Sequence, residues 1–453
     1  MVILRTHRRS ILCLKETSEQ REWHRRDRCR FVSERTARAK NRGQIVFLVA
    51  VGMVVLGGFA GLVFDGGMLY YEKRRMQSAA DAGAMGGAWE IVRGNTNLGA
   101  DIRPAALNDT THNGYSDDPP GNAEWWAQAT ITVNNPPASG PNAGNARFVE
   151  VIIDRPLSVS FMRLLGFSEA TVRARGVAGA VNIGDACVIA LNRTAGAALN
   201  IRGNANIFAD CGAMSNSNAA NGFQTDGDAN STFSWAGVTG GYVDNGGSGS
   251  MSPLPKEGVP PIYDPLSHLQ PPDYSGWPSG YYDASTMTYK CPGGQCVFDA
   301  KLEVGGPPGV KTFEPGTYVL RGGMEIQSSN VVTGTDVTFY NTGEGGFGFR
   351  TAGTSQVSFT APTTGDYKGV LMYTNPSAPY FLNELGRGDT TFTWRGAIYT
   401  PSQGLSIEGN PQGVNPWALM VADTIDFAGD AGVTFNAPPT DEAPEMLRVA
   451  MAE

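Results

Sequence analysis

The feature that most constrains this chain is an uninterrupted apolar segment near its N-terminus. Residues Gln44–Phe64 form a run of 21 residues with no charge and a single polar side chain. Because a helix rises about 1.5 Å per residue, this run covers the roughly 30 Å hydrocarbon core of a bilayer. The glycines Gly57, Gly58 and Gly61 fit this interpretation, since small residues let membrane helices pack closely. The segment therefore predicts a transmembrane helix.

A cleavable signal peptide is the alternative interpretation of the same segment. Its apolar stretch would be about 7–15 residues long and would end at a small-x-small cleavage site. The run in this chain is longer and follows a basic lead of 42 residues. Both properties favour a helix that stays in the protein.

Charge is distributed unevenly on the two sides of the apolar segment. The net charge of the chain is −8, yet residues 1–42 carry 13 Lys and Arg against 5 Asp and Glu. Cytoplasmic flanks of membrane helices carry the excess of basic residues, so we expect a single pass with a cytoplasmic N-terminus and an extracytoplasmic body. The expected partner of the basic arm 1–42 is a lipid bilayer with anionic headgroups, and not nucleic acid. The alternative is a translation start downstream of this arm.

The sequence predicts that the helix continues beyond the apolar segment to Val92. Its small side chains recur on one face: Ala79, Ala80, Ala82, Ala84 and Ala88. Gly83, Gly86 and Gly87 would each weaken the helix by roughly 0.5–1 kcal/mol relative to alanine, unless a closely packed partner requires them. We therefore interpret residues 43–92 as an anchor whose small-residue face is an assembly surface.

An ordered motif surrounds the apolar segment. Its residues are Arg42, Gly43 and Gln44 before the apolar run, then Asp65, and further on Gln77, Ala79, Ala80, Asp81 and Ala82. This order resembles the N-terminal domain of the Flp (Tad) pilus-assembly TadG-like family over about 50 residues, Arg42 to Trp89. The resemblance implies a tight-adherence envelope protein of the bacterial inner membrane. It also implies that other pilus-assembly or envelope proteins contact the 43–92 helix.

One departure from a related pattern refines this expectation. Pilins that a prepilin peptidase cleaves are similar in carrying Glu at the fifth position after Gly. The fifth residue after Gly43 is Leu48. We therefore expect a standing membrane component and not a polymerising pilin.

Residues 93–181 predict a small α+β module. The elements expected in it are a helix over 101–115, strands over 129–133 and 147–159, a short helix or hydrophobic elbow over 161–167, and a strand over 171–181.

Residues 182–453 predict a body built from β-strands. Glycine (58) and proline (28) are abundant and only 17% of residues are charged, which excludes a coiled coil. A recurring pattern ends in Gly followed by Asn or Asp, at residues 201–204, 225–228, 407–410 and 427–430. Such pairs turn corners between strands, because Gly adopts positive φ and Asn and Asp tolerate it. The pattern predicts a right-handed parallel β-helix, with a β-sandwich or jelly roll as the alternative.

The Pro- and aromatic-rich segment 251–292 interrupts this pattern. Proline cannot donate to a sheet ladder, so the segment cannot be a central strand. It is either a long loop that crosses the solenoid or a linker that divides it.

Four of the six cysteines follow the apolar segment, where disulfides persist in an extracytoplasmic compartment. Cys187 opens one strand and Cys211 ends the next coil, so we expect them to pair across adjacent coils. Cys291 and Cys296 enclose a turn and suit a local bridge. Other connectivities remain open. No C-x-x-C or paired histidine indicates a zinc site, and the sequence suggests no cofactor.

A catalytic body is the alternative to a structural one, since parallel β-helices often carry polysaccharide lyases and hydrolases. The candidate carboxylates are Asp226, Asp228, Asp423, Asp426 and Glu314. On one strand Asp226 and Asp228 would share a face and could form an acid/base pair or a calcium site, but Gly227 marks a turn. The body has a single histidine, His268, and no G-x-S-x-G motif, so we predict that the protein is not an enzyme.

Aromatic residues offer a second route to a polysaccharide. A glycan-stacking strip could comprise Trp235, Tyr242, Trp277, Trp394, Tyr399 and Trp417. The competing interpretation places them in the core. The sequence thus predicts a non-catalytic, membrane-anchored protein that supports a Tad/Flp-type pilus, with a glycan-binding or glycan-cleaving β-helix protein as the alternative.

Overall fold

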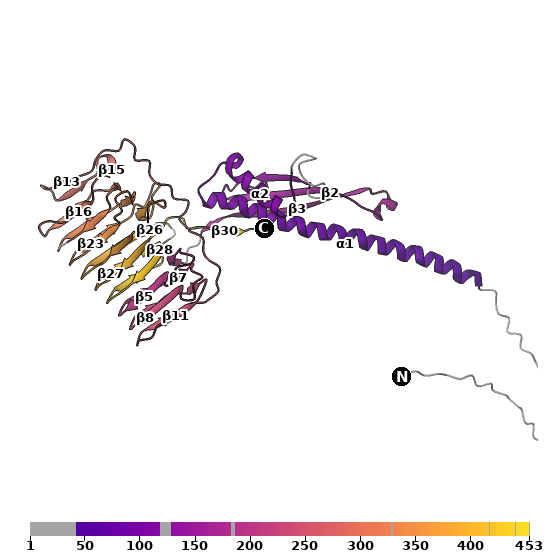
Figure 1. The fold of residues 1–453 in the computed structure, drawn as a ribbon. Coiled ribbons are helices and arrows are strands. Elements are labelled where there is room, and N and C mark those ends of the chain that lie inside the picture. The colour runs from indigo at the N-terminus through magenta and orange to yellow at the C-terminus, as the bar shows by residue number, and fades with distance from the viewer. Residues whose placement is uncertain are drawn as a thin grey trace, which may run out of the picture. The chain divides into compact units, whose positions relative to one another are not determined.

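The computed structural model describes residues 42–117, 128–182, 186–327, 329–415, 417–439 and 441–452. The basic arm expected at the N-terminus lies outside this part of the chain, except for Arg42. The chain divides into two units at Gly61, and the helix α1 (Arg42–Val92) runs through both. Its 51 residues form one continuous helix, as the apolar and alanine-rich sequence predicts (Figure 1).

A small module packs against the C-terminal half of α1. It comprises η1 (Leu98–Ile102), α2 (Arg103–His112), β1 (Thr130–Asn134), β2 (Phe148–Ser158), η2 (Met162–Leu165) and β3 (Glu169–Asn182). The strands form an antiparallel sheet in the order β1-β2-β3-β30, in which β30 is Leu447–Met451. The elements expected from the sequence are present. The sequence assigns 447–451 to the body, whereas the structure adds this strand to the module.

The contact between α1 and the module requires small residues on both sides. A Cβ at Gly176 of β3 would lie 2.7 Å from the backbone of Ala80, and a Cβ at Gly83 would lie 2.5 Å from Thr110 Cγ2. Ala80, Ala84 and their small neighbours on α1 are fully buried. The glycines that weaken the helix in isolation are therefore required by close packing.

The small-residue face of α1 is consequently covered within the chain. We expected this face to serve as an assembly surface, but the chain's own sheet and α2 occupy it. Most of the exposed large apolar residues of the helix lie at its other end, from Ile45 to Phe64.

The rest of the chain is a parallel β-solenoid with three faces, which excludes the sandwich and the jelly roll. The first face contains, in stacking order, β14 (Thr288–Lys290), β17 (Val310–Phe313), β20 (Val331–Gly334), β23 (Gln356–Thr360), the start of β26 (Thr391–Ile407), β27 (Gln412–Asn415), β29 (Gly432–Phe435), β6 (Asn206–Ala209), β9 (Asn230–Thr232) and β12 (Ser250–Ser252). The second face contains β15 (Gln295–Phe298), β18 (Gly316–Leu320), β21 (Val337–Asn341), β24 (Val370–Thr374), the middle of β26, the start of β28 (Trp417–Phe427), β4 (Ala186–Ala190), β7 (Gly212–Ser215) and β10 (Ala236–Val238). The third face contains β16 (Leu302–Val304), β19 (Met324–Ile326), β22 (Phe349–Thr351), β25 (Leu382–Leu385), the ends of β26 and β28, β5 (Leu199–Gly203), β8 (Phe223–Gly227) and β11 (Tyr242–Asp244). A short antiparallel strand, β13 (Tyr281–Asp283), pairs with β14, and η3 (Pro292–Gly294) precedes β15.

The coils do not stack in sequence order. The first coil lies on the last one, with Val188 opposite Met420, Leu199 opposite Ile425, and β6 opposite β29. In Figure 1 the magenta strand β5 accordingly follows the yellow strands β27 and β28. The chain therefore enters the solenoid in its middle, builds one end with β7–β12, and then builds the other end and returns with β14–β29.

The Pro-rich segment makes this order possible. Between β12 and β13 it crosses the second face, and its contacts reach successive coils. Asn216 bonds to Ile262, the hydroxyl of Tyr373 to the carbonyl of Leu269, and Val297 N to the carbonyl of Pro278. It is thus a long crossing loop, one of the two expected alternatives.

The predicted corners are present. Gly203, Gly227, Gly409 and Gly429 have φ values of 78°, 76°, 103° and 72°. They also stack, because a Cβ at Gly429 would lie 2.5 Å from the carbonyl oxygen of Gly409. These positions require glycine for two reasons: the backbone has a positive φ, and the neighbouring coil leaves no room for a Cβ atom.

Aromatic rings fill the interior at one end of the solenoid. Phe339 is fully buried, and its ring centroid lies 5.2 Å from Phe313, 5.5 Å from Tyr318 and 5.0 Å from Phe359. Gly334 provides the space for two of these rings, since its Cβ would lie 3.1 Å from each of Phe313 and Phe359.

We expect Phe339→Ala to lower the stability of the solenoid by about 3–5 kcal/mol, because it leaves a cavity among packed rings. The matched control is Phe208→Ala on the first face, where the side chain is 52% exposed. The control should change stability by about 0.5 kcal/mol or less. Circular dichroism melting of the full chain in detergent would measure both, and equal melting temperatures for the two variants would contradict this description of the core.

Candidate functional site

The candidate site is the region where α1 leaves its apolar segment. Side chains from Ile45 to Phe64 are largely exposed, with values such as 67% for Leu48 and 76% for Val54. Among the described residues, α1 is the one helix long and apolar enough to cross a membrane. An exposed apolar surface of this size is unusual in water, and the segment is long and apolar enough to span a bilayer.

Asp65 directly follows the apolar segment and is fully buried. Its carboxylate accepts hydrogen bonds from three consecutive backbone N–H groups, those of Ser160 (3.1 Å), Phe161 (2.7 Å) and Met162 (2.7 Å). These N–H groups stand at the N-terminal end of the short helix η2 between β2 and β3. N–H groups at the start of a helix have no hydrogen-bond acceptor within the helix. The motif aspartate therefore joins α1 to the tip of the β2–β3 hairpin, a role that the sequence did not indicate.

The second half of the motif joins α1 to β3. The Nε2 of Gln77 donates to Asp81 Oδ1 (2.7 Å) and to the carbonyl oxygen of Arg175 (2.6 Å). Burial raises the pKa of Asp81, and the hydrogen bond from Gln77 opposes this effect. Ala79 and Ala80 are fully buried. These residues therefore hold the module to the helix.

The remaining motif residues contribute differently. Ala82 is half-buried on α1. Arg42, Gly43 and Gln44 begin the helix, and their side chains lie outside the described part of the structure.

A buried ionic contact adds to this junction. Glu72 of α1 accepts a hydrogen bond from the Tyr115 hydroxyl (3.0 Å) and pairs with Arg155 of β2. Burial, together with the bond to Glu72, raises the pKa of Tyr115 to about 12. The tyrosine is therefore a hydrogen-bond donor throughout the physiological pH range.

These features define a class, a β-solenoid protein with an apolar N-terminal helix and an α+β module at its base. Residues 43–90 match the family model described as "Putative Flp pilus-assembly TadE/G-like". The match confirms the resemblance of the N-terminal domain. No curated protein and no solved structure matches the chain.

The carboxylates considered for catalysis do not converge on one site. β8 ends at Gly227, so Asp226 lies on the strand while Asp228 lies in the corner and accepts from Ser248 N (2.6 Å). The others are held in contacts between coils: Asp423 with Asn192, Asp426 with Arg202, and Glu314 with Lys290. Within the described ranges, no three His, Cys, Asp or Glu side chains are grouped to hold a metal ion.

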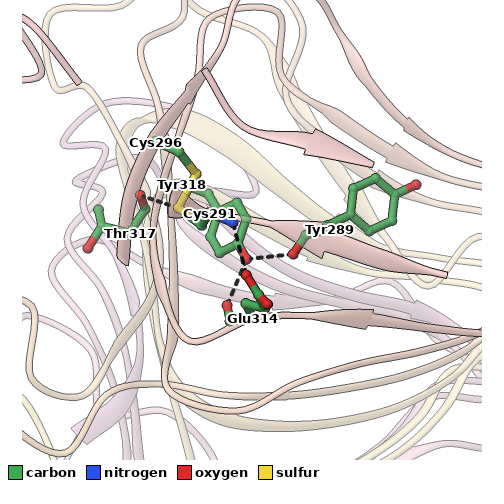
Figure 2. Close-up of a disulfide and its surroundings, with 6 residues drawn as sticks. All are labelled: Tyr289, Cys291, Cys296, Glu314, Thr317 and Tyr318. Atoms are coloured by element: carbon green, nitrogen blue, oxygen red, sulfur yellow. Dashed lines mark hydrogen bonds between the residues drawn. A yellow bond between two sulfur atoms is a disulfide. The ribbon is translucent and has the colours of Figure 1, made fainter. Parts of the chain in front are cut away.

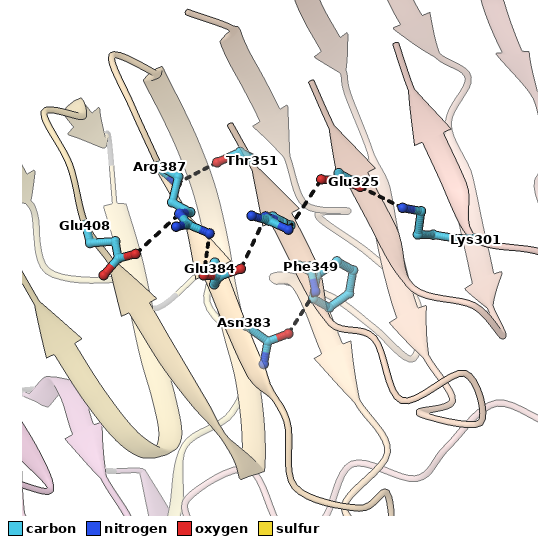
Figure 3. Close-up of polar contacts among 10 residues, drawn as sticks. Lys301, Glu325, Phe349, Thr351, Asn383, Glu384, Arg387 and Glu408 are labelled. Carbon is cyan, nitrogen blue, oxygen red and sulfur yellow. Dashed lines mark hydrogen bonds and ion pairs between the residues drawn. The ribbon is translucent and has the colours of Figure 1, made fainter. Parts of the chain in front are cut away.

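Charges on the third face form a continuous ladder (Figure 3). Along it Lys301, Glu325, Arg350, Glu384, Arg387 and Glu408 alternate in sign, with N–O distances of 2.7, 3.7, 3.2, 3.0 and 3.3 Å. Four of these five contacts join neighbouring coils, whereas Glu384 and Arg387 lie three residues apart on the same coil. Because exposed pairs contribute only about 0–1 kcal/mol each, we interpret the ladder as a device that favours the correct stacking register.

The proposed aromatic strip is not present on the surface. Trp394, Tyr399 and Trp417 are at most 3% exposed, so their assignment to a glycan-binding strip is wrong and their assignment to the core is correct. The other three residues of the proposed strip, Trp235, Tyr242 and Trp277, are half-buried. Tyr399 lies on the second face, beneath the crossing loop.

A different surface is exposed on the first face. The strand register aligns a row of uncharged, mostly hydroxyl-bearing side chains from coil to coil: Thr288, Thr312, Thr333, Ser358, Thr393, Val414, Thr434, Phe208, Thr232 and Ser252. Thr393 and Val414 directly follow the paired residues Phe392 and Gly413. We name this the hydroxyl row. The signal for this row in the sequence is the recurrence of Thr or Ser at an outward position of most of these strands, and the predictions from the sequence did not include it.

Two disulfides stabilise the solenoid. Cys187 is bonded to Cys211 on the neighbouring coil, and Cys291 to Cys296, the pairs expected from the sequence. Figure 2 shows the second pair next to Tyr318, whose hydroxyl donates to the carbonyl oxygens of Glu314 (2.7 Å) and Tyr289 (3.2 Å). Disulfides of this kind persist in oxidising compartments.

The crossing loop carries a buried carboxyl group, that of Asp264, whose pKa is raised. Asp264 accepts hydrogen bonds from the Tyr399 hydroxyl (2.7 Å) and from Leu266 N (3.0 Å). Burial raises the pKa of Asp264 to about 6, even though both hydrogen bonds favour the charged form. The loop is thus attached to the second face by a carboxyl group that burial keeps protonated up to a pH of about 6.

We expect this group to lower stability as the pH rises from about 4 to about 6. In that window the unfolded chain has already released the proton while the folded chain still binds it, so unfolding is favoured by about 2–3 kcal/mol at pH 7 relative to pH 4. Asp264→Asn should remove this dependence. Denaturant unfolding of the full chain in detergent at both pH values measures it, with Asp366→Asn in an exposed loop as the control. A constant stability difference between wild type and Asp264→Asn at the two pH values would contradict the assignment.

Proposed function

We propose that this chain is a non-catalytic, single-pass protein of the bacterial inner membrane that supports the assembly or anchoring of a Tad/Flp-type pilus. The observation that carries the proposal is the family match over residues 43–90, together with the structure of its motif. The motif residues after the apolar segment bind α1 to the module through Asp65, Gln77 and Ala80. The motif therefore encodes an anchor that holds an extracytoplasmic domain in a defined orientation.

The orientation of the protein in the membrane is part of this proposal. The basic residues of the arm 1–42 favour a cytoplasmic N-terminus. The two disulfides support a solenoid on the opposite, oxidising side of the membrane.

Partner contacts belong to the exposed surfaces. Because the small-residue face of α1 between Met76 and Val92 is buried against the module, we assign pilus-assembly or envelope partners to the apolar segment, the module surface and the solenoid. No nucleic acid or cofactor enters the proposal.

We expect deletion of the gene to abolish surface pili and adhesion, and the full chain to restore them. Gly176→Leu should fail to restore them although the protein remains in the membrane fraction, because its side chain collides with the backbone of Ala80. Gly99→Ala is the matched control, since its Cβ meets only ordinary contact at 3.6 Å. Electron microscopy of the cell surface gives the count of pili, and normal pili in the deletion strain would overturn the assembly role.

A second candidate function is the binding of a polysaccharide, and the hydroxyl row favours it. Eight of the ten side chains in the row carry an uncharged hydroxyl group, and neighbouring hydroxyls lie close together, as in the contact between Thr312 and Thr333 (3.4 Å). A glycan strand offers hydroxyl groups at a similarly regular spacing, so the two surfaces are chemically complementary.

If this candidate is correct, the full chain should be retained on insoluble polysaccharides such as peptidoglycan sacculi, cellulose or chitin. The double variant Thr333→Arg and Thr393→Arg should lose retention, whereas Thr363→Arg in an exposed loop should keep it. Equal retention of all three proteins would exclude the row as the binding surface. Release of soluble sugar that is lost in Asp226→Ala and Asp228→Ala would instead overturn the non-catalytic assignment.

A further inference from the structure

An exposed apolar cluster lies at the tip of the β2–β3 hairpin. Phe161, Leu164, Leu165 and Phe167 are 42%, 85%, 65% and 58% exposed. They are adjacent on one turn, which closes through Gly166 at φ 93°. We name these four residues the apolar tip. Four large apolar side chains gathered on one turn indicate a contact with something other than water.

The tip lies next to the end of the apolar segment of α1. The ring of Phe161 is 6.2 Å from that of Phe64, with an interplanar angle of 73°. Phe64 is the last residue of the apolar segment and is itself 60% exposed. The apolar tip therefore contacts the last residue of the apolar segment.

Asp65 satisfies the backbone N–H groups of the tip that would otherwise be unpaired beside lipid. The three N–H groups that open η2 would cost several kcal/mol each if they were unpaired in an apolar environment. The buried carboxylate of Asp65 accepts a hydrogen bond from every one of them. The same contacts fix the direction in which the tip leaves α1.

The tip carries little charge, as expected for a segment in contact with lipid. The stretch from Ser158 to Ser168 contains one charged residue, Arg163, which is exposed, and no acidic residue. An arginine at the edge of an apolar surface can extend its guanidinium group to lipid phosphates while its stem stays in the apolar layer.

We propose that the apolar tip inserts into the outer leaflet of the membrane that α1 crosses, as a second and shallow contact with the bilayer. This inference rests on the proposed membrane anchor and deepens it. A single transmembrane helix is free to rotate about its own axis. When a hairpin attached to one side of the helix also inserts into the bilayer, that side of the helix must face the hairpin, and the rotation is restricted. The tip thereby sets the rotation of α1 and holds the end of β2 against the bilayer.

A depth measurement on the full chain tests this. Cys13→Ser and Cys29→Ser leave only disulfide-bonded cysteines, and single cysteines are then introduced by Leu164→Cys, Val54→Cys or Ala143→Cys. Each is labelled with an environment-sensitive fluorophore. The protein is placed in vesicles of phosphatidylethanolamine and phosphatidylglycerol that carry a nitroxide at a shallow or a deep position of the acyl chain.

The label at residue 164 should emit at shorter wavelength and be quenched by the shallow nitroxide several-fold more strongly than the label at residue 143. Ala143 lies in the exposed loop between β1 and β2, at the opposite end of β2. The label at residue 54 should be quenched by the deep nitroxide. Adding Asp65→Ala should reduce quenching at residue 164 and leave residue 54 unchanged, because it releases the tip but not the helix.

The outcomes separate the two proposals. If residue 164 behaves like residue 143 while residue 54 is quenched, the tip is not in lipid and this inference is wrong, while the anchor stands. If residue 54 is also unquenched, the anchor itself is wrong. Unchanged quenching at residue 164 in Asp65→Ala would overturn the role of Asp65 in placing the tip.

Discussion

The stacking of the first coil of the solenoid on the last coil is the interaction on which the rest of the structure depends. β4, β5 and β6 pair in parallel with β28 and β29, so the middle of the solenoid is built from segments more than 200 residues apart. A parallel strand without a neighbour leaves a row of unpaired backbone groups, and this pairing satisfies both halves at once. It also brings the start and the end of the body together. β30 can therefore leave the last coil and pair with β3, which leads into the first.

That closure explains how a solenoid is connected firmly to a single helix. The module has a four-stranded sheet whose edge strand comes from the C-terminus, so both ends of the solenoid chain are attached to it. The sheet then packs on the alanine and glycine face of α1, where Gly176 and Gly83 permit backbone contact. Two connections and a close-packed face restrict motion of the body more than one flexible linker would. This arrangement suits a protein that presents a large domain from a membrane anchor.

The surface of the solenoid is divided according to its chemistry. The second face is covered by the crossing loop, and the third carries paired charges between Lys301 and Glu408. The first face exposes the uncharged hydroxyl row. The candidate carboxylates, in contrast, are engaged in contacts between coils.

The sequence alone determined the features that depend on local chemistry. The apolar segment, the Gln77–Ala82 motif, the glycine corners and the short strands follow from composition, spacing and backbone preference, and the structure contains them. For the cysteines the sequence favoured one connectivity among several, and the structure contains the favoured pairs. Only the tertiary structure decided the order of the coils and the pairing of β30 with β3. It also decided the burial of Trp394 and Tyr399 and the hydrogen bonds between Asp65 and the hairpin tip. Each depends on contacts between residues far apart in the chain, and a repeating pattern of similar strands contains no local signal for which coil lies on which.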